Sequence, residues 1–117
     1  MSLAFSPDSR LGLSGTFERD VRLWDLQTGK ELHTFALKSR STGVAFSADG
    51  KTLAVSTLDG QVIVWDTATR TKLHEWQLPG PVHAVTFAND SRHLATANGN
   101  GTVYILRIAP PPLKDTK

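Results

Sequence analysis

Four histidines are the residues of this chain best suited to hold a metal ion or to carry a proton. His33 and His74 stand 41 residues apart, each two positions before an aromatic side chain. His83 and His93 lie on neighbouring predicted strands and could approach each other. A zinc site needs at least three protein ligands, so two imidazoles make a poor one. A histidine that recurs at a fixed interval is better explained by architecture, and the sequence predicts no metal site.

The motifs of nucleophilic catalysis and phosphate binding are also missing from the sequence. Without cysteine there is no thiol nucleophile, disulfide or thiolate metal site. Ser14-Gly15-Thr16 is not a Gly-x-Ser-x-Gly elbow, and the sequence has no Asp-x-Asp-x-Asp calcium loop. Asn98-Gly99-Asn100-Gly101 joins two predicted strands and lacks the Gly-Lys-Ser/Thr ending of a phosphate loop. We therefore expect no enzyme activity and no cofactor.

The composition is that of an ordinary globular domain. Of the 117 residues 39% are hydrophobic and 21% are charged, so disorder is a poor interpretation. The longest apolar run, Val62-Ile63-Val64-Trp65, is far shorter than the roughly 20 residues of a membrane helix. The N-terminal residues lack the apolar core of a signal peptide. We expect a cytoplasmic protein that does not contact a membrane.

The net charge of +2 predicts nucleic-acid binding only if the basic residues cluster. Three of them recur at the 41-residue interval, each close to an aspartate: Arg10, Lys51 and Arg92, near Asp8, Asp49 and Asp90. The carboxylates cancel most of the field of such a ring. We interpret these residues as solvated turn charges and expect no nucleic-acid partner.

The elements that would position a site follow from an internal repeat of 41 residues without gaps. Leu3-Ala4-Phe5-Ser6-Pro7-Asp8 returns as Val44-Ala45-Phe46-Ser47-Ala48-Asp49 and again as Val85-Thr86-Phe87-Ala88-Asn89-Asp90. Val21-Arg22-Leu23-Trp24-Asp25 returns as Val62-Ile63-Val64-Trp65-Asp66 and weakens to Val103-Tyr104-Ile105-Leu106-Arg107. A period of this length indicates stacked supersecondary units.

Each unit has the pattern of short strands, rich in β-branched and aromatic residues and separated by turn residues. Asp49-Gly50, Asp59-Gly60 and Asn100-Gly101 suit tight hairpin turns. We predict strands at 3–6, 11–16, 21–25, 31–37, 43–47, 52–57, 61–66, 72–78, 82–88, 93–98 and 102–108. Pro110-Pro111-Pro112 ends strand pairing, so 110–117 is predicted to be a proline-rich tail behind a domain at 1–109.

These motifs resemble the tryptophan–aspartate (WD) repeat family over residues 3 to 108, in three repeats at about 3–43, 44–84 and 85–108. The resemblance implies an all-β fold, a β-propeller with blades of four antiparallel strands. It also implies a hydrogen-bond network within each blade, here incomplete in every copy. The residues that match the signature are Ser14, Trp24, Asp25, Asp59, Trp65, Asp66 and Thr96. We expect blades held mainly by apolar packing.

In this family one rim of turns usually binds partners. The predicted turns of that rim carry Phe17, Arg19, Lys38, Arg40, Leu58, Pro81 and Gly99. Phe17 and Leu58 are apolar tips that could anchor a partner or pack between neighbouring turns. The three basic residues could meet an acidic partner or serve solubility alone.

Three repeats give two four-stranded blades and one three-stranded remnant, whereas closed propellers have about four to eight blades. Open terminal faces and an open strand edge favour association. The chain could therefore self-assemble head to tail, or be the C-terminal piece of a longer propeller. We favour self-assembly, with two chains and six blades preferred over three chains and nine.

The expected function is a non-catalytic protein-interaction scaffold. One alternative is a purely architectural or engineered partial propeller whose only activity is self-association. Another is a small-molecule or enzymatic propeller that uses the central channel. The apolar Ala4, Ala45 and Val85 on the innermost strands speak against the last.

Overall fold

The computed structural model describes residues 2–16 and 18–108, and every regular element in those ranges is a β-strand. The eleven strands are β1 (Ser2–Phe5), β2 (Leu11–Gly15), β3 (Asp20–Asp25), β4 (Glu31–Ala36), β5 (Ser41–Phe46), β6 (Thr52–Thr57), β7 (Gln61–Asp66), β8 (Lys72–Gln77), β9 (Val82–Phe87), β10 (His93–Asn98) and β11 (Val103–Arg107). Each falls within two residues of its predicted range. The proposed tail at 110–117 lies outside the described residues.

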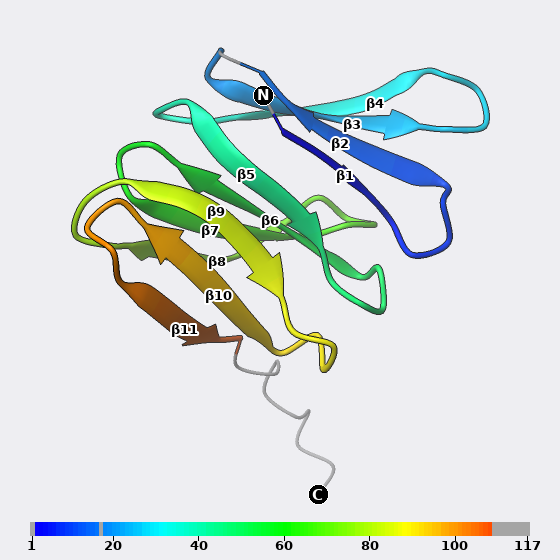
Figure 1. The fold of residues 1–117 in the computed structure, drawn as a ribbon. Coiled ribbons are helices and arrows are strands. Elements are labelled where there is room, and N and C mark those ends of the chain that lie inside the picture. Colours follow the sequence, from blue (N-terminus) through cyan, green and yellow to red (C-terminus); the bar gives the residue numbers. More distant parts are fainter. Residues whose placement is uncertain (1, 17, 109–117) are drawn as a thin grey trace, which may run out of the picture.

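The strands form three antiparallel sheets in chain order: β1-β2-β3-β4, β5-β6-β7-β8 and β9-β10-β11. We call them the first, second and third blade. The first strands of the blades, β1, β5 and β9, lie side by side, and the later strands of each sheet run outward from them (Figure 1). The all-β prediction of about three blades, with a three-stranded last blade, is confirmed.

Hairpin turns connect the strands as the sequence predicted. Gly50, Gly60 and Gly101 have φ of 72°, 98° and 86°, which a residue without a Cβ adopts at little cost. The turn between β5 and β6 is further closed by Ser47, whose Oγ donates to Asp49 Oδ1 at 2.6 Å.

Apolar side chains between the blades form two core clusters. The first blade packs on the second through Leu13, Val21, Leu23 and Phe35 on one side and Val44, Leu53, Val55, Ile63 and Trp65 on the other. The second blade packs on the third through Ala54, Val62, Val64, Val82, Val85 and Leu94. The second blade is thus covered on both faces. Each fully buried Leu or Val contributes roughly 1.5–3 kcal/mol through burial.

Candidate partner-binding rim

The candidate rim consists of the six described residues that the sequence placed on one set of turns: Arg19, Lys38, Arg40, Leu58, Pro81 and Gly99. All six are exposed. Phe17, the seventh predicted residue, lies outside the described residues. The rim is formed by the turns between the second and third strands of each blade and by the segments that join one blade to the next.

Backbone hydrogen bonds hold these turns together pairwise. Leu58 N donates to Arg40 O at 2.9 Å, and Gly99 N donates to Pro81 O at 2.9 Å. The two hydrogen bonds occupy equivalent positions in successive repeats. Arg19 O accepts from Leu37 N at 2.9 Å, which brings Arg19 beside the segment that carries Lys38. The structure therefore brings Leu58 beside Arg40 and Gly99 beside Pro81, each pair at the end of the pairing between the first two strands of one blade.

Leu58 projects from a turn that is fixed on several sides. Thr57 Oγ1 donates to Asp59 Oδ1 and accepts from Gln61 N at 3.0 Å. Gln77 Nε2 donates to Asp59 O at 2.8 Å from the outer strand β8. Leu58 itself is 42% exposed, so neighbouring turns leave much of it uncovered. Because the turn is already fixed, a partner that binds Leu58 need not order the backbone around it.

The charges of the rim are mixed. Glu75 accepts from Lys72 Nζ at 2.9 Å, and this hydrogen bond, together with the charges of Lys72 and Lys38, lowers the pKa of its carboxyl group. Glu18 lies next to Arg19 in sequence and is exposed. Acidic groups therefore offset part of the positive charge of Arg19, Lys38 and Arg40, and the electrostatic field of the rim is modest.

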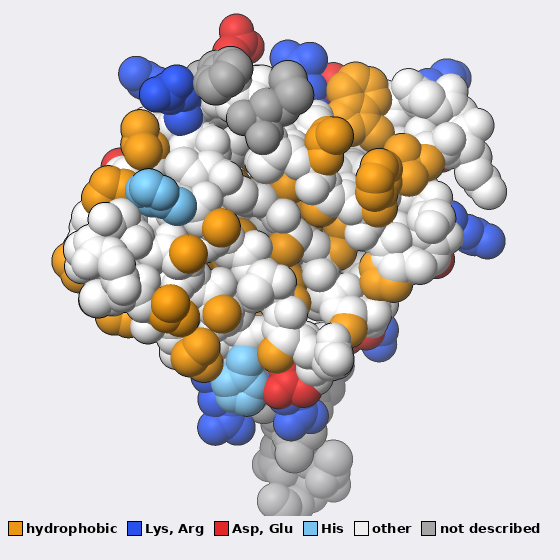
Figure 2. All heavy atoms as spheres, viewed as in Figure 1, with side chains coloured by type: hydrophobic (Ala, Val, Ile, Leu, Met, Phe, Trp, Pro, Cys, Tyr) orange, Lys and Arg blue, Asp and Glu red, His pale blue; other side chains and the backbone are white. Residues whose placement is uncertain are grey.

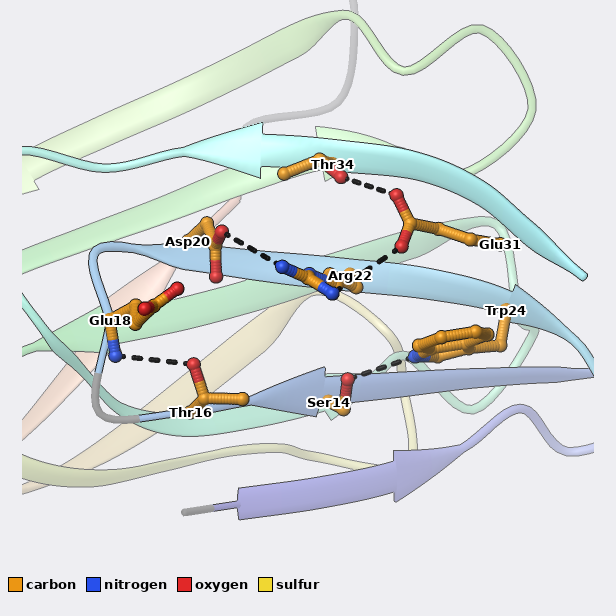
Figure 3. A network of polar contacts seen from close by, with 8 residues as sticks. All are labelled: Ser14, Thr16, Glu18, Asp20, Arg22, Trp24, Glu31 and Thr34. Carbon is orange, nitrogen blue, oxygen red and sulfur yellow. Dashed lines mark hydrogen bonds and ion pairs between the residues drawn. The ribbon is translucent and has the colours of Figure 1, made fainter.

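The hydrogen-bond network expected within each blade is formed only in part. Trp24 Nε1 donates to Ser14 Oγ at 2.9 Å in the first blade (Figure 3). Val55 takes the place of Ser14 in the second blade, where Trp65 instead packs against Phe35 with ring centroids 4.6 Å apart. In the third blade Thr96 Oγ1 donates to Asn98 Oδ1 at 3.0 Å.

Sequence reasoning missed Thr57 and Asn98, whose side chains hydrogen-bond across the turn between β6 and β7 and the turn between β10 and β11. For Thr57 the signal was present in the sequence, because Ser6 and Ser47 also stand two residues before an aspartate of a turn. Glu18, in the corresponding turn of the first blade, donates its backbone N–H to Thr16 Oγ1 at 3.1 Å (Figure 3), and no described hydrogen bond or ion pair uses its carboxylate.

The histidines serve separate local contacts. The rings of His33 and Phe35 lie 4.6 Å apart, and those of His74 and Trp76 lie 5.5 Å apart. His83 stands at the start of β9 and His93 at the start of the antiparallel β10, so they occupy opposite ends of the pair. The prediction that these two could approach each other is not met. Among residues 2–16 and 18–108, no group of three His, Asp or Glu side chains is placed to hold a metal ion.

Two further surfaces of the molecule are the outer faces of the terminal blades. On the third blade, Val103 and Ile105 are 64% and 65% exposed, and Ala84 and Ala97 beside them are exposed as well. Figure 2 shows hydrophobic side chains spread over this face of β9, β10 and β11. We call it the C-terminal face.

The outer face of the first blade, the N-terminal face, is partly apolar and partly charged. Leu3 and Phe5 are 66% and 67% exposed on β1. Arg22 on β3 lies 3.8 Å from Asp20 and 3.7 Å from Glu31, and Figure 3 shows this strip across β3 and β4. In the second blade the residue at the position of Arg22 is Ile63, which is buried.

Comparison with family models identifies the class of protein that this architecture defines. The family of the WD domain, G-beta repeat, matches residues 1–25, 29–66 and 70–106. The chain belongs to this family. No curated protein matches the chain. Domains of this family are in general non-catalytic scaffolds for protein interaction. The described part of the chain contains no helix that could cross a membrane.

Proposed function

We propose that this chain is a non-catalytic protein-interaction scaffold whose blades associate head to tail with a second copy to close a six-blade propeller. In this arrangement the C-terminal face of one copy covers the N-terminal face of the other at both junctions. The candidate rim then continues around the ring and presents Leu58 and its symmetry mate to a protein partner in the cytoplasm.

The observation that carries the proposal is a contrast between equivalent positions. Val62 and Val64 in the second blade are fully buried, whereas Val103 and Ile105, one repeat later, are 64% and 65% exposed. Leu3 on β1 is 66% exposed, whereas its equivalent Val44 is 8% exposed. A further blade on each terminal face would bury these side chains. Burial would stabilise the assembly by roughly 1.5 kcal/mol or more for each side chain.

The N-terminal face sets a cost against this gain. Closure would remove water from Arg22 and its two carboxylate partners, and desolvation of an ion pair can exceed the attraction within it. The proposal therefore predicts an interface of moderate strength that dissociates on dilution.

The test is the mass of the full chain in solution, from size-exclusion chromatography with light scattering over a dilution series. We expect about twice the 12.7 kDa of one chain at high concentration. Ile105→Lys, on the C-terminal face, should shift the chain toward monomer. Leu73→Lys is the matched control, because it also replaces an exposed apolar side chain by lysine, but on the outer strand β8. It should leave the mass unchanged.

A folded monomer at every concentration would overturn self-closure, and so would a dimer that Ile105→Lys leaves intact. A trimer would keep self-association but refute the six-blade ring. Aggregates of mixed mass would indicate that the missing blades belong to another part of a longer chain.

A further inference from the structure

A groove between the first and second blades lies on the rim opposite the candidate rim. It has a volume of about 580 Å³ and is bordered by the turns between β1 and β2, β5 and β6, and β7 and β8. Binding pockets in proteins commonly span 300–1,000 Å³. The groove lies within one chain, so it exists whether or not the chain self-associates.

Three leucines from consecutive strands of the first blade supply the apolar wall. Leu23 on β3 is fully buried, Leu11 on β2 is half-buried, and Leu32 on β4 is 38% exposed. The exposed part of Leu32 leaves apolar surface in contact with water. An aliphatic side chain of a ligand would cover it and gain free energy from burial.

Two carboxylates stand at the mouth of the groove with one oxygen each still available. Asp8 Oδ1 accepts from Ser6 Oγ at 2.6 Å and from Arg10 N at 3.0 Å. Asp49 Oδ1 accepts from Ser47 Oγ at 2.6 Å and from Lys51 N at 2.9 Å. The Oδ2 atoms of Asp8 and Asp49 have no hydrogen-bond or ion-pair partner in the described part of the chain.

In the third repeat the second oxygen of the turn carboxylate does have a partner. Its equivalent residue, Asp90, places Oδ2 at 2.6 Å from Nδ1 of His93. The residues at the position of His93 in the first two repeats are Leu11 and Thr52, so Asp8 and Asp49 have no ion pair there, although the charges of Arg10 and Lys51 act on them. The Ser6 hydroxyl and the Arg10 N–H lower the pKa of Asp8, so its negative charge persists at neutral pH.

The remaining polar groups of the groove fit a peptide better than a lone cation. Asp66, Lys51 and Arg70 also line it, so both signs of charge are present, and no described ion pair joins them. Thr67 is only 7% exposed, and its Oγ1 has no described hydrogen-bond partner. A peptide backbone supplies both donors and acceptors for such groups.

We propose that this inter-blade groove binds an extended segment of a partner protein in which a lysine or arginine adjoins an aliphatic residue. The aliphatic side chain packs against Leu11 and Leu32. The cationic side chain meets the free oxygens of Asp8 and Asp49. This site is distinct from the candidate rim and from the two terminal faces.

The experiment selects peptides from a random heptapeptide phage library on the immobilised full chain and measures the enriched peptides by fluorescence anisotropy. We expect enriched peptides to share a basic residue beside Leu, Ile or Val. The double change Asp8→Asn and Asp49→Asn should weaken their binding about fivefold, as two exposed charge contacts warrant. Binding should also weaken between about 50 mM and 500 mM salt.

Asp90→Asn is the matched control, because it removes a turn carboxylate outside the groove, and it should change Kd less than about twofold. Leu32→Ser provides a second test that leaves every turn hydrogen bond intact, and it should also weaken binding. Failure to enrich peptides, enrichment without a basic residue, or affinity unchanged by both the double change and Leu32→Ser would overturn the proposal. Self-association enters none of these outcomes, so failure here is distinguishable from failure of ring closure.

Discussion

Gly60 offers the sharpest test of how the second blade is joined to the third. It sits in the turn between β6 and β7 at φ 98°, and its carbonyl accepts from Leu78 N at 2.8 Å. A Cβ built on Gly60 would lie 2.5 Å from Leu78 O and 2.6 Å from Gly80 O. The turn thus packs against the segment that leads into β9, with no room for a methyl group.

The expected cost of Gly60→Ala has two parts. A positive φ costs an L-residue roughly 1–2 kcal/mol. Forcing the methyl group against two carbonyl oxygens adds about 1–3 kcal/mol, the usual range for overpacking. The free energy of unfolding should therefore fall by about 2–5 kcal/mol, enough to unfold much of a marginally stable chain.

Gly29→Ala is the matched control. Gly29 has φ 75°, and a Cβ there would meet nothing within 4 Å, so only the backbone part of the cost applies. Both variants should be compared by urea denaturation, followed by tryptophan fluorescence at one chain concentration. If Gly60→Ala costs no more than Gly29→Ala, the turn is not packed on the inter-blade segment and the reasoning is refuted.

Three other changes probe the core, the tryptophan contact and the turn carboxylates. Leu53→Ala, at a fully buried position, should lower the free energy of unfolding by about 2–5 kcal/mol in the same assay, and a loss below about 1 kcal/mol would contradict the first core cluster. Ser14→Ala removes the acceptor of Trp24 Nε1 and should cost about 0.5–1.5 kcal/mol, because water can reach the half-buried indole. Asp8 has a lowered pKa in the folded chain, so it stabilises the fold above its unfolded pKa near 3.8 and ceases to do so as pH falls through the folded value. Asp8→Asn should therefore lower the free energy of unfolding at neutral pH, and the difference from wild type should vanish only at acid pH. A difference that stays constant down to about pH 2 would contradict this.

Much of the fold could be predicted because it repeats locally. Phe5, Phe46 and Phe87 mark the same position in the three innermost strands, and each pairs with an equivalent residue of the second strand of its blade. A hydrophobic pattern of period two leaves little freedom in such pairing. The three-stranded last blade of the described residues could also be predicted, because no strand-like run follows Arg107 in the sequence.

Other features depend on how strands and blades pair in space. His83 and His93 are ten residues apart in sequence, but antiparallel pairing places them at opposite ends. The groove near Leu32 combines turns from two repeats, so only the assembled blades reveal it.

The family segments and the blades are out of step by one strand, and this stagger governs how the chain can change length. The segments 29–66 and 70–106 each begin ahead of the outer strand of one blade, β4 or β8, and run through β7 or β11 of the next. Removing the segment 70–106 would take β8 from the second blade and leave it with three strands, as the third blade has now. Duplicating a segment would likewise add one outer strand and three inner ones. Gain or loss of whole repeats therefore regenerates a three-stranded C-terminal blade with the same kind of edge, whatever the number of repeats.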